Sequence, residues 1–231
     1  MQRESGHWIA GSQDGELIVI GVTGRHEWRG SDYEIEAAKN DAARKVAMFY
    51  GLRGIIEVVD AAGSSVFDFI FDSRVKLEHI VDYRQFLDRL RFDRDRDVFV
   101  HDYGTMVRFR YAASVTQVNF VGSIRANGRP NWLDRRRLPE LEGYIVEIGF
   151  SENQWYLEET VMLSAANVAA RMIRNISTRV DFVGGDIAGE DAAVRTHFRS
   201  EGVLHGFRVL EFWIDPRNGH AYTLGIARFF E

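Results

Sequence analysis

The sequence predicts an α+β protein of two tandem β-α-β-β(-β) modules, residues 1–126 and 127–231, each with one alanine-rich helix packed on a mainly antiparallel sheet. Three observations support this prediction. An alanine-rich helical pattern occurs twice, as EIEAAKNDAARKVAMF (34–49) and as VMLSAANVAARMIRNI (161–176). Four landmarks recur in the same order in both halves, which favours an internal repeat. Around each helix the apolar residues alternate with a period of two, which is typical of strands.

The four landmarks are a tryptophan, a strand that closes on glycine, the alanine helix and a hairpin-like pair of strands. In the first half they are Trp8, 17–21, Ala42-Ala43-Arg44 and 98–111. In the second half they are Trp132, 144–149, Ala169-Ala170-Arg171 and 211–229. Each pair is weak alone, and it is their shared order that predicts a duplication.

Both helices have one apolar stripe, because their apolar residues fall three or four positions apart. The stripes are Ile35, Ala38, Ala42, Val46 and Phe49 in the first helix, and Val161, Ala165, Val168, Met172 and Ile176 in the second. Small side chains on such a stripe let a helix approach a sheet closely, so we expect Ala42 and Ala169 to face a sheet. The patterns 31–34 and 151–154 resemble capping boxes, and Gly51 stands where a C′ glycine is expected.

Further elements follow from local patterns. Strands are expected at 53–60, 144–150 and 207–215, and DPRNG (215–219) has the composition of a turn between two strands. Two insertions break the symmetry of the halves: a short helix is expected within 86–97, and a flexible loop within 184–198. The segment 123–140 is the expected seam, because it holds prolines, Asn-Gly and an arginine run.

Composition limits the function classes. A hydrophobic content of 45% supports packed cores, and the net charge of −5 gives no basic excess for general nucleic-acid binding. The absence of cysteine excludes disulfides and thiolate metal sites. The first residues have no apolar h-region, and no apolar run approaches the roughly 20 residues that span a bilayer.

No motif identifies a reaction, a metal or a cofactor, so no catalytic, metal or cofactor-binding residue is predicted. The histidines never fall at H-x-x-x-H spacing, and DRDRD (93–97) lacks the glycine and glutamate of a calcium loop. GVTG (21–24) lacks the spacing and the lysine of a phosphate loop and is interpreted as a strand exit. There is no G-x-S-x-G nucleophile elbow. A catalytic carboxylate pair stays open, because Asp and Glu are plentiful and no spacing nominates one.

Six residues are possible partner contacts. The run Arg135, Arg136 and Arg137 is interpreted as part of a solvated linker, with a grip on lipid or RNA phosphates as the alternative. Trp28, Trp155 and Tyr156 stand where a helix is about to begin. They are interpreted first as hydrophobic staples that pack on the helix, and alternatively as an exposed patch for a partner.

The landmarks resemble those of the Lpp-twenty-type bacterial outer-membrane lipoproteins, as tandem copies, and are similar to the amino-terminal domain of the flagellar assembly protein T. The resemblance rests mainly on Trp8, Gly21, Asp41-Ala-Ala-Arg44 and Gly51, then Trp132, Gly149, Ala169-Ala-Arg171, Trp213-Ile-Asp215 and Tyr222-Thr-Leu224. The second copy departs from the pattern, with Val168 at the helix aspartate. The chain has no lipid-attachment cysteine.

The resemblance implies a location on the periplasmic side of the outer membrane, with the cytoplasm as the alternative. It implies envelope or flagellar-assembly proteins as partners, and attachment to the membrane only through a lipid anchor that this chain lacks. We therefore expect a non-enzymatic envelope protein with a scaffold or assembly role and without cofactors. The alternative is a small-ligand binder or an enzyme with a site in the cleft between the modules. An RNA-binding module is the third option.

Overall fold

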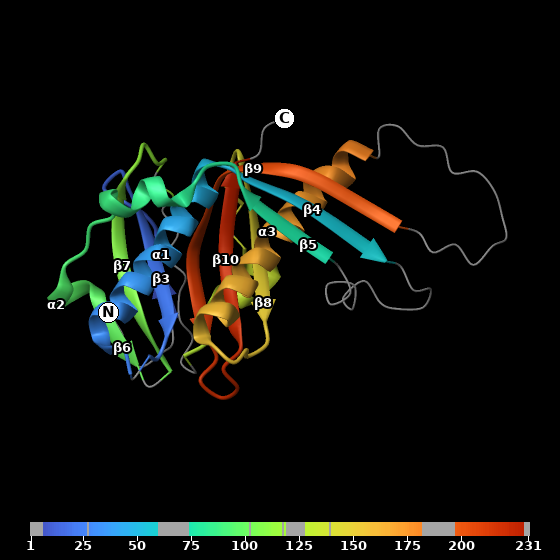
Figure 1. Cartoon of the computed structure of the whole chain (residues 1–231). Helices are drawn as coiled ribbons and strands as arrows, with labels where there is room; N and C mark the ends of the chain where they lie inside the picture. The colour runs from blue at the N-terminus through green and yellow to red at the C-terminus, as the bar shows by residue number, and fades with distance from the viewer. Residues whose placement is uncertain are drawn as a thin grey trace, which may run out of the picture.

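The computed structural model describes residues 7–26, 28–59, 74–101, 103–116, 118, 128–138, 140–181 and 197–228. It confirms the α+β class, with two long helices and two antiparallel sheets (Figure 1). The helices are α1 (Gly30–Tyr50) and α3 (Leu157–Asp181). The short helical elements are η2 (Tyr83–Arg89), α2 (Arg94–Asp97), η3 (Asn131–Leu133) and η4 (Arg135–Arg137).

The smaller sheet comes entirely from the first half of the chain. Its strand order is β2 (Gly11–Gln13), β3 (Glu16–Gly24), β7 (Gly104–Ala112) and β6 (Val98–His101). Helix α1 covers one face of it, and the alanines of the helix share a core with Val19, Val107 and Phe109 of the strands.

The larger sheet combines strands from both halves. Its order is β5 (Arg74–His79), β4 (Leu52–Val59), β9 (His197–Ile214), β10 (Ala221–Arg228) and β8 (Tyr144–Ser151), and β1 (His7–Ile9) also pairs with β9. Helix α3 covers one face, where Val168, Met172 and Ile173 pack against Leu52 and Phe207. On the other face Trp132 packs among residues of β8, β9 and β10.

Strand β9 is the central strand of this sheet, because it pairs with β4, β10 and β1. Its first part pairs with β4 (Leu52 opposite Leu204), and its last part pairs with β10 and with β1. After β1 the Ala10 N–H donates to the Leu210 carbonyl at 2.7 Å, and the chain then enters β2 of the smaller sheet. Strands β1, β4 and β5 precede residue 126 but belong to the sheet of the second half, so main-chain hydrogen bonds cross the division between 1–126 and 127–231.

The apolar stripes of the two helices are buried as expected. Ala42 and Ala169 have no exposed surface, and Phe49 and Ile176 at the stripe ends are partly buried against their cores. The expectation that both alanines face a sheet is confirmed.

A glycine under each helix allows this close approach. A Cβ on Gly21 of β3 would lie 2.0 Å from the Ala38 carbonyl oxygen, and one on Gly149 of β8 would lie 1.9 Å from the Ser164 carbonyl oxygen. Neither distance is possible for a real side chain. Only glycine fits where β3 passes under α1 and where β8 passes under α3.

Polar side chains hold each helix to the residues on either side of that glycine. In α1, Lys45 Nζ donates to the Ile20 carbonyl at 2.6 Å, and Asp41 Oδ2 accepts from the Val22 N–H at 2.8 Å. In α3, Arg171 donates to the Ile148 carbonyl at 2.8 Å, as Lys45 does in α1, and Asn167 donates to the Phe150 carbonyl at 2.7 Å. We call each set a helix clamp.

The helix ends differ from the sequence-based expectations. Neither predicted capping box forms. The α1 N-cap is Arg29, without a side-chain hydrogen bond, and Glu34 accepts instead from the His26 N–H at 2.8 Å. Ser151 lies in β8, and it is Thr160 that accepts from the Gln154 N–H, at 2.9 Å. Both acceptors therefore belong to their helix, Glu34 to α1 and Thr160 to α3, and each binds an N–H of the loop before that helix.

Other elements agree with the sequence more closely. Gly51 ends α1, but in an extended conformation, and a Cβ there would lie 2.8 Å from Ile80. The helix expected in 86–97 is present as η2 and α2, and the turn at 215–219 forms with Asp215 accepting from the Gly219 N–H at 2.8 Å. Most of 184–198 lies outside the described residues, and its last two residues begin β9.

Candidate interaction surface

The loop before α1 presents Trp28 to solvent, with 98% of its surface exposed. A turn closed by the Arg29 N–H on the His26 carbonyl (2.9 Å) precedes the helix, and Gly30 takes φ +74° to start it. The interpretation of Trp28 as a hydrophobic staple is wrong, because the tryptophan packs on neither the helix nor a core. Its backbone is placed by the turn and its side chain is left free of the protein interior.

The loop before α3 presents Trp155 in the same way, with 97% of its surface exposed, and Tyr156 beside it is 52% exposed. Thr160 organises this loop, because its hydroxyl accepts from the Gln154 N–H and donates to the Tyr156 carbonyl at 3.2 Å. The staple interpretation is therefore wrong for Trp155 also.

Both loops lie at one end of the molecule, where α1 and α3 begin (Figure 1). A Cβ on Gly24, the last residue of β3, would lie 3.4 Å from a ring atom of Tyr156. Tyr33 on α1 and Tyr103, next to the Gly104 that pairs with Gly24, are further exposed aromatic residues near these loops. We call Trp28, Tyr33, Tyr103, Trp155 and Tyr156 the aromatic end. Sequence reasoning missed the two tyrosines, whose only signal was their place beside a helix start and a strand turn.

Buried polar contacts fix the scaffold beneath the aromatic end. Glu34 is buried, and its carboxylate accepts from the Thr105 hydroxyl and from the His26 N–H. Burial alone would raise the pKa of Glu34, but these hydrogen bonds outweigh it and hold the pKa below its ordinary value of 4.5. The Arg29 guanidinium lies 4.6 Å from the ring centre of Tyr33, a cation–π contact.

The arginine run at 135–137 lies away from the aromatic end. Arg135 ion-pairs with Glu147 of β8 at 3.4 Å, and Glu147 also accepts from Asn175 at 2.7 Å. Asn175 is roughly 27 Å along α3 from Leu157, at about 1.5 Å per residue. Arg136 is exposed, and the side chain of Arg137 lies outside the described residues. Arg135 and Arg136 therefore do not join the aromatic end.

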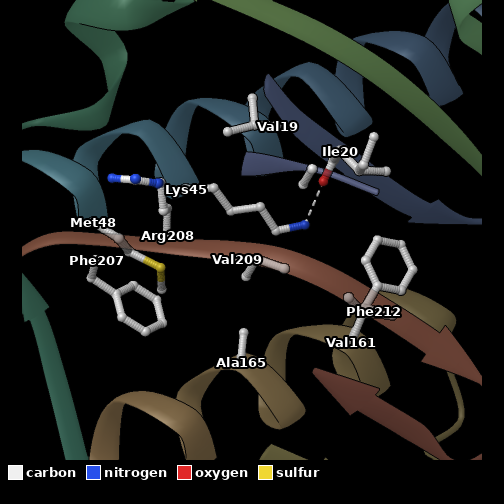
Figure 2. A pocket seen from close by; sticks show the side chains of 11 residues that line it. Val19, Ile20, Lys45, Met48, Val161, Ala165, Phe207, Arg208, Val209 and Phe212 are labelled. Atoms are coloured by element: carbon white, nitrogen blue, oxygen red, sulfur yellow. Dashed lines mark hydrogen bonds between the residues drawn. The ribbon is translucent and has the colours of Figure 1, made fainter. Parts of the chain in front are cut away.

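A small, partly enclosed cavity lies between α1, β3, α3 and β9 (Figure 2). Its volume is about 20 Å³, enough for one water molecule. Apolar side chains such as Met48, Val161 and Phe212 line it, and Lys45 spans one side to reach the Ile20 carbonyl. This cavity has no room for a substrate or a cofactor.

The other sequence patterns have structural roles in the described part of the chain. Asp93 and Asp97 of DRDRD accept from backbone N–H groups of α2 and its start. In GVTG, Gly24 lies against the Glu158 carboxylate, which would repel a phosphate. No group of three or more His, Asp or Glu in the described residues could hold a metal ion. No described helix is both long and apolar enough to cross a membrane.

Comparison with protein-family models, with curated proteins and with solved structures finds no match for this chain.

Proposed function

We propose that this protein is a non-enzymatic bacterial envelope protein that works through protein–protein contacts, with the aromatic end as its contact surface. The observation that carries the proposal is the near-complete exposure of Trp28 and Trp155, at equivalent places before two helices. Large aromatic residues are the side chains that dominate binding energy in protein interfaces.

The energetic argument is simple. A tryptophan buries about 150–250 Å² in an interface, which is worth roughly 5 kcal/mol at about 25 cal/mol per Å², before ordering costs are subtracted. The fold gains none of this energy from Trp28 or Trp155 as they stand. A partner that covers both side chains would gain it twice. The buried hydrogen bonds of Glu34 and Thr160 hold both loops ready, so little ordering is needed on binding.

We also propose that the two halves arose by duplication of one β-α-β-β(-β) module. The helix clamps support it, because in each half a glycine is flanked by the two strand residues that the helix holds. When the clamp residues are matched, the two helices align one residue away from the alignment that the repeated AAR triplet gives. Arg171 corresponds to Lys45, since each donates to the carbonyl before the glycine, and Asn167 corresponds to Asp41, since each binds the residue after it, Asn167 through its carbonyl and Asp41 through its N–H. The strand orders β3-β7-β6 and β8-β10-β9 correspond as well.

The proposed location is the periplasmic side of the outer membrane, with envelope or flagellar-assembly proteins as partners and a cytoplasmic location as the alternative. These assignments rest on the resemblance of the landmarks to the Lpp-twenty-type lipoproteins. Fractionation of cells that express the natural gene tests them. Recovery in the soluble cytoplasmic fraction would refute the envelope location.

Site-specific photocrosslinking in cells tests the contact surface. A photoreactive phenylalanine analogue replaces Trp28 or Trp155 in turn, and Ile80, which is exposed away from the aromatic end, is the control position. We expect one crosslinked species of the same mass from positions 28 and 155 and none from 80. Trp155→Ala should weaken the crosslink from position 28. Equal crosslinking at all three positions, or none at 28 and 155, contradicts the proposal.

A separate screen tests the proposal that the protein is not an enzyme. Purified protein is assayed against broad panels of hydrolase and transferase substrates, and we expect no turnover above that of Trp28→Ala/Trp155→Ala protein or buffer. Reproducible turnover would end the non-enzymatic proposal and would leave the crosslinking result to stand by itself.

A further inference from the structure

Arg208 on β9 is a buried cation, with 3% of its surface exposed. Figure 2 shows its side chain on the opposite face of β9 from Phe207 and Val209. One terminal nitrogen donates to the Thr116 carbonyl at 2.9 Å, but Nε is buried without a hydrogen-bond partner. Burying a charge is costly unless it is paired, so the folded protein carries an electrostatic cost at this position.

The described neighbours of Arg208 do not neutralise it. Its guanidinium lies 5.6 Å from the ring centre of Tyr144 and hydrogen-bonds to the side chain of that tyrosine, but a neutral hydroxyl does not cancel the charge. Burial is the largest cause of the lowered pKa of Arg208, and the positive charge of Arg228 lowers it further. Tyr144 and the Thr116 carbonyl favour the charged form. Two guanidinium groups and a hydroxyl therefore lie together without a carboxylate from the described residues.

A β-bulge brings the two arginines together. Ile226 pairs with Arg208, but Arg228 pairs with His205, so β9 has one residue more than β10 in this interval. Gly206 takes φ +66°, and a Cβ there would lie 3.2 Å from Arg228 Cγ. The Arg228 side chain thus lies across Gly206. Bulges often direct side chains into functional positions.

The cluster borders an open surface groove. Gly15, Glu16, Ala112 to Thr116 and Arg228 line this groove. The Thr116 carbonyl accepts from Arg208, so the buried guanidinium lies directly behind the groove wall. The one carboxylate in the lining, Glu16, is ion-paired with Arg91. An anion that entered here would meet Arg228, with the charge of Arg208 and the Tyr144 hydroxyl that hydrogen-bonds to both arginines behind it.

We propose that Arg208, Arg228 and Tyr144 form a binding site for a small oxyanion, a phosphate or a carboxylate. Arg228 would contact the anion, Arg208 would supply buried positive charge behind it, and the Tyr144 hydroxyl would orient both arginines through its hydrogen bonds. Guanidinium groups match the planar oxygen pairs of both anions. The site is independent of the aromatic end and does not rest on the proposed function.

Calorimetric titration with inorganic phosphate, and with acetate as the carboxylate probe, tests the site against sodium chloride at equal ionic strength. We expect saturable binding of at least one probe, weakened at least 10-fold by Arg228→Gln and about 3-fold or more by Tyr144→Phe. Arg84→Gln, an exposed arginine on η2, should stay within 2-fold of the wild type. The stronger probe identifies the anion class. No saturable binding of either probe, or equal affinity in Arg228→Gln, overturns the proposal.

Arg208→Met provides a second readout that a merely structural role would not give. In buffer without phosphate or carboxylate its melting temperature should equal or exceed that of the wild type, because an uncompensated buried charge is removed. The increase in melting temperature that phosphate or acetate gives the wild type should be lost. A large fall in anion-free buffer would show that Arg208 is compensated within the protein, and would overturn the proposal.

Discussion

Strand β3 passes under α1 at Gly21, and strand β8 passes under α3 at Gly149, with equivalent helix clamps on both sides of each glycine. The two clamps differ in their chemistry. Lys45 forms an ion pair with Asp41 as well as its bond to the strand, whereas Arg171 has a buried Nε without a partner and Asn167 is neutral. The α1 clamp is therefore the better satisfied of the two, and the α3 clamp tolerates an unpaired polar atom.

The surroundings of the two helices differ as well. After α1 the chain leaves its own sheet, since β4 and β5 pair with β9 and with each other in the larger sheet. Helix α3 stays on the sheet of its own strands. The contact between a helix and the glycine of its strand is therefore common to both halves. The halves differ because the first half gives β4 and β5 to the sheet of the second.

The largest expected effect concerns the two glycines. Gly21→Ala and Gly149→Ala should each destabilise the fold by about 3 kcal/mol or more, because the new methyl group would overlap a backbone carbonyl that cannot move aside. Urea denaturation measures both variants. Gly202→Ala is the control, since a Cβ there would approach only a methyl group of Ile173, at 3.3 Å, and no backbone atom. Equal stability of all three variants would mean that the helices do not rest on these glycines.

The second largest effect is expected from Trp8 and Trp132, the tryptophan landmarks of the two halves, whose substitutions should cost different amounts of stability. The Trp132 indole donates to the buried Glu211 carboxylate at 2.6 Å, whereas the buried indole nitrogen of Trp8 has no partner in the described structure. Trp132→Phe should therefore cost about 2 kcal/mol more than Trp8→Phe, since it removes a hydrogen bond to a charged group. Thermal unfolding compares them. A larger loss from Trp8→Phe would reverse the assignment of these roles.

The clamps themselves give the third comparison. Lys45→Met should destabilise by about 1–2 kcal/mol, because the mostly buried Asp41 loses its ion-pair partner and the Ile20 carbonyl loses a donor. Arg171→Met should cost less than about 1 kcal/mol, because it also removes a partly unsatisfied buried cation. Denaturant midpoints of both variants decide the matter. The reverse order would show that Arg171 is the stronger link.

Acid should expose the role of Glu34. Its pKa is lowered in the folded protein, so its stabilising contribution is complete above the ordinary value of 4.5 and is lost as pH falls through the lower folded pKa. Thr105→Val removes one of the hydrogen bonds responsible. The gap in unfolding free energy between wild type and variant should shrink below pH 4.5. A gap that stays constant down to pH 2.5 would contradict this account.

The smallest effect is expected at the aromatic end. Trp28→Ala and Trp155→Ala should each change the unfolding free energy by less than about 0.5 kcal/mol, because exposed side chains contribute little to folding. Scanning calorimetry measures this. A loss of 2 kcal/mol or more in either variant would place that tryptophan in the fold and remove it from the proposed contact surface.

Much of the local structure could be predicted from the sequence. Periodicity located both helices, their buried alanines and most strands, because those patterns record which face of each element is buried. Strand pairing could not be predicted, since period two says that a residue lies in a strand but not which strand lies beside it. Strand β9 was expected only over 207–215, whereas its first part, opposite β4, has polar and glycine residues.

The site was only partly predictable. Trp28 and Trp155 could be identified as aromatic residues that stand before a helix, but their exposure follows from how the loops turn, which no spacing shows. The predicted capping boxes do not form, because Glu34 and Thr160 instead accept hydrogen bonds from N–H groups of the loops before the helices. Arg208 carried no signal, because alternation in a strand gives no reason to expect a buried guanidinium behind a bulge.

The pairing of β4 with β9 has a consequence for biosynthesis. Residue 52 leaves the ribosome about 150 residues before residue 204, its neighbour in the sheet. At about 5–20 residues per second this interval is on the order of ten seconds. During that time one edge of the β4–β5 hairpin has no strand to pair with, and open edges are templates for aggregation. Newly made chains should therefore depend on chaperones until the last quarter of the protein has been translated.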